Sequence, residues 1–266
     1  MPVEAVLAVV GILLLGYSTW FFPSSLASGG ALRAAVSATA LLTYCVAFLG
    51  LSRSRSLSVQ PAIEIGRSAG IALGSAAVAG HTLEVFAGLR PPVPAILGVA
   101  MWGLMFLLLG AAAADTCRRE RSIITGVVSS MWGALTSASI TVVFALSVGL
   151  LFMSRMEKLL RVTPASVVRN MLDGATSHLM LAPVVAVAAA IASGVAYSVV
   201  KSVSSRTAAG LSVAAVLVSV GGLNALRFAS TLQRSARPPY VMLGVIALGI
   251  GLTSAAALFT ASRRQF

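Results

Sequence analysis

Long apolar runs separated by short polar breaks make up most of the chain. A helix of about 20 mainly apolar residues crosses a bilayer core about 30 Å thick. Seven runs reach this length, at residues 3–22, 31–51, 93–114, 122–153, 177–200, 208–226 and 240–261. A weaker run at residues 65–89 also carries Arg67, His81 and Glu84. The pattern predicts an all-α, polytopic transmembrane helical bundle of eight spans, with seven as the alternative.

The breaks between the runs are polar, basic or rich in proline. Residues 90–94 and 234–240 contain prolines, which cannot continue a helix, and residues 115–121 read as a short charged turn. The run at 122–153 would be about 48 Å long as one helix. Since this exceeds the bilayer core, we expect that run to tilt, protrude or break.

Residues 154–176 depart from the spanning pattern, because apolar and basic positions alternate there at helical spacing. Thr163 and Pro164 are typical of a helix start, and Gly174 of a helix end. We predict an interfacial amphipathic elbow at 154–176, formed by two short helices that break near Pro164 and lie on the membrane surface.

Composition supports a membrane protein. The chain is 58% hydrophobic and 10% charged, whereas soluble domains are about 45–50% apolar and about 25% charged. We therefore expect a single integral membrane domain over residues 1–266, with the lipid bilayer as its main partner.

The net charge of +12 has a simple explanation in this setting. The basic residues lie in loops, where they orient the spans and meet anionic headgroups, so we expect no nucleic-acid partner. Their distribution over the two sides does not decide the orientation. Apart from Lys158 and Lys201 the basic residues are arginines, and Ala, Gly and Val abound. This composition suggests a multi-pass protein of the bacterial cytoplasmic membrane.

The weaker run at 65–89 is the most informative part of the chain. A face of small residues allows another helix to approach closely, and this face holds Gly66, Gly70, Gly74 and Ala77. His81 and Glu84 continue the face, and an ionisable group at membrane depth suggests function. We expect this helix to be the most enclosed of the bundle. The pair would serve as a proton relay or ion site, or merely cap the span near the headgroups.

Other polar positions add weaker hypotheses. His178 lies near Asp173 in sequence, and Pro183 should kink its helix and free a carbonyl. A stripe on the run at 122–153 would pack against other helices or line a pathway; it comprises Gly126, Ser130, Ala134, Ser137 and Thr141.

Recognisable catalytic motifs are absent from the sequence, including Walker A, Gly-x-Ser-x-Gly and His-Glu-x-x-His patterns. Two histidines could in principle ligate a haem, but no surrounding signature supports it, so we expect no cofactor and no metal. Cys45 and Cys117 match no pairing motif and should be free thiols.

Three functional hypotheses remain open. The favoured one is a small transporter, a permease-like subunit or an accessory subunit that assembles with another membrane protein. The second is an intramembrane enzyme or a redox or proton-relay protein that uses His81, Glu84 and His178; enzymatic activity is the less favoured expectation. The third is a structural or regulatory membrane protein without a substrate.

Overall fold

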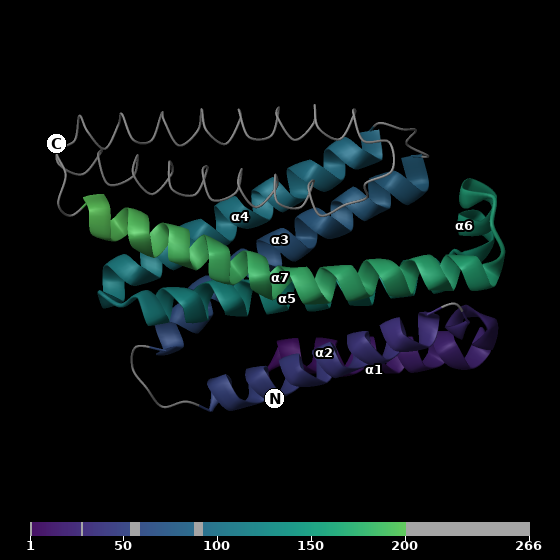
Figure 1. Cartoon of the computed structure of the whole chain (residues 1–266), viewed down its shortest axis with the longest axis horizontal. Coiled ribbons are helices and arrows are strands. Elements are labelled where there is room, and N and C mark those ends of the chain that lie inside the picture. Colours follow the sequence, from purple (N-terminus) through teal and green to yellow (C-terminus); the bar gives the residue numbers. More distant parts are fainter. Residues whose placement is uncertain (1, 28, 54–58, 88–92, 201–266) are drawn as a thin grey trace. The chain divides into compact units, whose positions relative to one another are not determined.

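A computed structural model describes residues 2–27, 29–53, 59–87 and 93–200 of the chain. Every regular element within these ranges is a helix, which confirms the all-helical prediction (Figure 1). In order they are α1 (Val3–Phe21), the 3-10 helix η1 (Pro23–Leu26), α2 (Gly30–Ser52), α3 (Val59–Ala87), α4 (Val93–Glu120), α5 (Ile123–Leu151), α6 (Met153–Leu160) and α7 (Pro164–Val200).

Six of the described helices are long and apolar enough to cross a membrane, by length and composition. They are α1, α2, α3, α5, the Ala100–Glu120 part of α4 and the Pro164–Gly194 part of α7. This indicates a membrane protein. The six correspond to six of the eight runs expected from sequence, and the runs at 208–226 and 240–261 lie outside the described residues.

The chain divides into two compact units, each assembled from three segments. The first comprises Met1–Gln60, Gly70–Ala95 and Ala134–Val184. In it α1 and α2 form an antiparallel hairpin through η1 (Figure 1). Large buried side chains of this unit are Leu41, Phe48, Leu146, Leu172 and Leu179.

The second unit comprises Pro61–Ala69, Ile96–Gly133 and Val185–Phe266. Phe106, Leu109 and Trp132 are buried in its described part. Ser193 of α7 donates a hydrogen bond to the carbonyl of Gly110 in α4 (3.0 Å). Hydroxyl-to-carbonyl bonds therefore join helices in this unit in addition to apolar packing.

The long run at 122–153 forms one helix, α5, which does not break. At 29 residues it is about 44 Å long, so it tilts or protrudes in a bilayer. α5 is also the most buried span described: 56% of the residues in its apolar stretch are buried, against 28% for α3. The expectation that the glycine-rich helix would be the most enclosed is therefore wrong. The small face of α3 is narrow, and its other side exposes residues such as Ile71 and Leu83.

The predicted elbow at 154–176 is only partly correct. α6 is a separate short helix, and Pro164 begins a new one, as expected. However, α7 continues through Gly174 as one helix of 37 residues, so residues 164–176 are not a second interfacial helix. Val168, Leu172 and Leu179 extend one buried stripe across the expected break. Gly174 faces open space, where glycine costs only about 1 kcal/mol relative to alanine.

The charged turn expected at 115–121 is shorter than predicted, because α4 continues to Glu120. Asp115 pairs with Arg118 (2.6 Å) and Arg119 (2.8 Å) one turn later, and such spacing supports a helix. The helix stops at Arg121, which has a left-handed backbone (φ 53°).

Candidate functional site

Two polar side chains of α7 that are close in sequence lie on different sides of the helix. Asp173 and His178 are about 140° apart around an α-helix. Asp173 pairs with Arg33 of α2, whereas His178 is close enough to His81 of α3 for their charges to interact. The structure therefore does not bring the four predicted residues His81, Glu84, His178 and Asp173 into one group.

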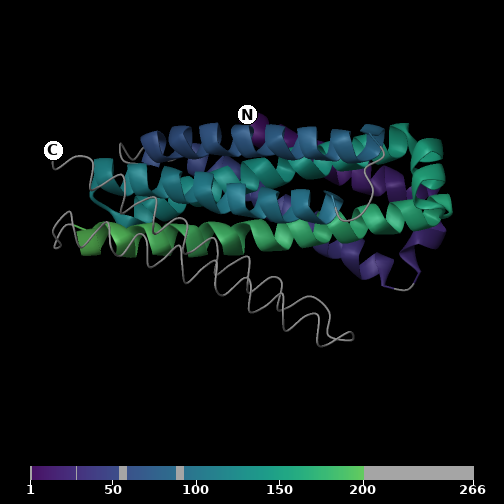
Figure 2. The same ribbon diagram turned by 90° about the horizontal axis from the view of Figure 1, so that it is seen from above.

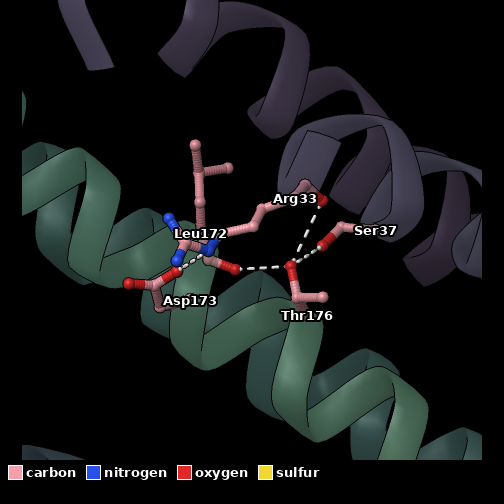
Figure 3. Close-up of polar contacts among 5 residues, drawn as sticks. All are labelled: Arg33, Ser37, Leu172, Asp173 and Thr176. Carbon is pink, nitrogen blue, oxygen red and sulfur yellow. Dashed lines mark hydrogen bonds and ion pairs between the residues drawn. The ribbon is translucent and has the colours of Figure 1, made fainter. Parts of the chain in front are cut away.

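A polar cluster joins α2 to α7 within the first unit, and Figure 3 shows it. We call Arg33, Ser37, Asp173 and Thr176 the α2–α7 cluster. The Arg33 guanidinium forms an ion pair with Asp173. The Thr176 hydroxyl contacts the hydroxyl of Ser37 (2.9 Å) and the carbonyls of Leu172 (2.7 Å) and Arg33 (3.2 Å). Because a hydroxyl has one proton, Thr176 donates to the nearer carbonyl and accepts from Ser37.

The ion pair of this cluster adds little to the stability of the fold and mainly positions α2 against α7. The side chains of Arg33 and Asp173 are 38% and 43% exposed, and exposed pairs stabilise a fold by about 1 kcal/mol or less. Arg33 also lies in the first turn of α2. The cluster therefore joins the beginning of α2 to the amino-terminal third of α7.

A second α2–α7 contact supplies a hydrogen bond that a proline removes from the α7 backbone. Pro183 lies inside α7 and has no N–H, so the carbonyl of Leu179 lacks its usual helical donor. The Tyr44 hydroxyl of α2 donates a hydrogen bond to that carbonyl. Tyr44 is almost fully buried, and water is absent from a bilayer core, so this bond satisfies an acceptor that would otherwise be costly.

Another side of α7 carries His178, which lies near His81 of α3. The His81 Nδ1 atom lies 3.7 Å from the Glu84 carboxylate, and the two side chains are 44% and 47% exposed. His178 approaches His81 from α7. The array of a carboxylate and two imidazoles can bind and release protons, because each of these groups is titratable.

The described residues of this array do not form a metal-binding site. In the part of the chain that the structure covers, no group of three or more His, Cys, Asp and Glu side chains could hold a metal ion. Asp173, the remaining predicted member, is occupied by Arg33 on the other side of α7.

An arginine holds the carboxyl end of α3, which carries this array. Arg155 of α6 donates to the carbonyls of Phe86 (2.9 Å) and Val85 (3.3 Å) and lies over the Phe86 ring at 5.1 Å. The last carbonyls of a helix have no helical donor, so Arg155 caps α3. Phe86 also meets Phe152 edge-on at 4.9 Å. These contacts tie the end of α3 to the α5–α6 corner.

The small residues of α3 pack closely. Gly66, Gly70, Gly74 and Ala77 are all buried. A Cβ atom added at Gly66 would lie 2.2 Å from the carbonyl oxygen of Ser129 in α5, so the two backbones touch there. One added at Gly74 would meet the Ile140 side chain at 2.8 Å. The approach of α5 to α3 is therefore limited by backbone atoms at Gly66 and by a side chain at Gly74.

The stripe on α5 makes helix contacts. Ser130 donates to the carbonyl of Ala186 in α7 (2.9 Å), and Thr141 donates to the carbonyl of Ser137 in its own helix (2.8 Å). All five members of the stripe, Gly126, Ser130, Ala134, Ser137 and Thr141, are buried. These contacts correspond to the packing interpretation of the stripe.

Several residues of these contacts were not expected from sequence, namely Arg33, Ser37, Tyr44, Arg155 and Thr176. A tyrosine within an apolar run signals a polar group that needs a partner, so Tyr44 could have been noticed. Nothing in the sequence pairs it with Leu179, because the two residues lie on helices far apart along the chain.

Comparison of the chain with protein-family models, curated proteins and solved structures finds no match. The side-chain arrangement around α7 is accordingly the basis of the functional proposal.

Proposed function

We propose that this chain is a small multi-pass transport protein of the bacterial cytoplasmic membrane, or the permease-like subunit of a transporter. His81, Glu84 and His178 form its proton-responsive element. The proposal rests on one observation: an imidazole of α7 lies near an imidazole of α3, which has a carboxylate 3.7 Å away. Ionisable groups on spanning helices are costly and usually functional. Among side chains, imidazole is the one that ordinarily changes charge near neutral pH.

The array gives protonation a mechanical consequence. A proton on His81 creates an ion pair with Glu84 on the same helix. His178 of α7 lies close enough to His81 for their charges to interact, so a positive charge on His81 also acts on α7. Proton occupancy therefore changes the balance between two arrangements of these helices, which is what coupling to transport requires. The bacterial membrane is supported by composition, since arginine replaces lysine almost throughout.

The test uses the purified full chain in liposomes that enclose a pH-sensitive dye. Under an imposed pH gradient, we expect proton entry above that of protein-free vesicles. His81→Asn and Glu84→Gln should each lower it by about 100-fold, the usual contribution of a positioned proton-transfer group. Glu64→Gln is the matched control, because Glu64 is an exposed carboxylate on the same helix; it should leave the rate unchanged.

Thermal unfolding of each variant separates function from folding. Variants that unfold like the parent but conduct no protons support the proposal. Parent protein that conducts no more than empty vesicles would refute it, and so would equal rates in the Glu64→Gln and Glu84→Gln variants.

The hydroxyl contacts favour a second candidate, a structural or accessory subunit without a substrate. Ser130 and Ser193 bond to neighbouring helices and not to an open path. Affinity purification in mild detergent would then recover a membrane partner at a constant ratio, and His81→Asn would change neither that ratio nor proton entry.

A further inference from the structure

The corner around α6 combines exposed apolar and basic side chains. α6 has no buried residue, and the large apolar residues of the corner are exposed, namely Leu151 (78%), Phe152 (40%), Leu159 (41%) and Leu160 (42%). α6 runs across the helix axes of the first unit, as Figures 1 and 2 show. A short amphipathic helix with this course suits the boundary between headgroups and acyl chains.

The basic side chains in this corner differ in whether they bind other parts of the protein. Arg155 is committed to the end of α3 through the carbonyls of Val85 and Phe86. Lys158 and Arg161 are exposed, and the covered part of the chain shows no ion pair for either. Two cations next to exposed leucines thus point outward from a helix that Arg155 holds in position.

We propose that Lys158 and Arg161 bind the phosphate of an anionic phospholipid, while Leu159 and Leu160 contact its acyl chains. The charge of the pair complements an anionic headgroup, and guanidinium and ammonium groups are the usual phosphate ligands. The adjacent leucines favour a lipid over a free anion, since a dissolved phosphate gains nothing from apolar surface. This goes beyond the proposed transport function and does not depend on it.

The full-length protein in a neutral detergent tests the proposal by titration with phosphatidylglycerol or phosphatidylcholine. Melting temperature and lipid retention in native mass spectrometry are recorded. We expect phosphatidylglycerol, and not phosphatidylcholine, to raise the melting temperature. Replacing both residues (Lys158→Gln with Arg161→Gln) should weaken its apparent affinity about 30-fold, since each basic residue near an anionic surface contributes about 1 kcal/mol.

The matched control replaces two other exposed arginines (Arg53→Gln with Arg121→Gln). It removes the same charge, and Arg121 shares the left-handed backbone of Arg161 (φ 53° and 55°). The control should retain the parent affinity. Equal loss in both double variants would overturn the site in favour of a general charge effect. Equal stabilisation by inorganic phosphate would overturn the lipid assignment, and no preference for phosphatidylglycerol would overturn the proposal.

Discussion

Tyr44 shows how one side chain can compensate for a proline in a spanning helix. Pro183 removes the donor for the Leu179 carbonyl, and the Tyr44 hydroxyl takes its place. Leu179 directly follows His178 in α7, so the α2–α7 contact braces α7 next to the proton-responsive element. The brace therefore links a backbone defect to the position of a functional side chain.

Removal of this hydroxyl should destabilise the protein. Tyr44→Phe leaves the Leu179 carbonyl without a donor, and we expect a loss of about 1–2 kcal/mol in the free energy of unfolding. Pro183→Ala restores an N–H at the correct position, so Tyr44→Phe should cost less in that background. The four proteins of the cycle are compared by denaturant titration in detergent. Tyr17→Phe, on an exposed tyrosine, is the control. Equal costs in both backgrounds would contradict the compensation.

At this scale the sequence predicts chemistry better than partners. His81 and Glu84 stand out because ionisable residues are rare in apolar runs, and the carbonyl freed by Pro183 follows from helix geometry. Sequence proximity groups Asp173 with His178, but in α7 the two residues lie next to different neighbours. Partners such as Arg33 depend on which helices meet, and no local pattern contains that information.

Among the helices, α3 offers the sharpest test of packing. Gly66 touches the α5 backbone at the Ser129 carbonyl, whereas Gly80 on the same helix has nothing within 4 Å of an added Cβ. Gly66→Ala should destabilise the protein, because backbone cannot move aside as a side chain can. Gly80→Ala should be neutral or stabilising by up to about 1 kcal/mol, the gain in helix propensity. Thermal unfolding of both variants in detergent measures the contrast, and equal melting temperatures would contradict the close approach.

Helix boundaries were the least predictable feature of the elements. Apolar runs identified the described spans because a bilayer demands long apolar helices. The local sequence predicts breaks at Gly174 and at residues 115–121, yet α7 passes through Gly174 and α4 continues to Glu120. Buried stripes and ion pairs at helical spacing outweigh the local preference for a turn at these places. Pro164 does begin a helix, because the missing N–H of a first-turn proline has no partner to lose.

For the molecule as a whole, the order of the described helices gives a topology. If each of the six apolar helices crosses once, alternate connections lie on opposite sides of the membrane. The η1 turn and α6 then share one side, and the α4–α5 turn lies on the other. This expectation fixes relative sidedness without deciding which side faces the cytoplasm.

Single cysteines introduced into a background lacking Cys45 and Cys117 test this topology. Both natural thiols are buried, so their replacement by alanine removes slow background labelling. Cysteines replacing Ser24 and Lys158 should react with a membrane-impermeant maleimide from the same side of sealed vesicles, and one replacing Arg119 only from the other. The prediction follows from the number of crossings, because an uncounted or missing span between positions 24 and 158 would reverse their relationship. Labelling of Ser24 and Lys158 positions from opposite sides would therefore show that one described helix does not cross.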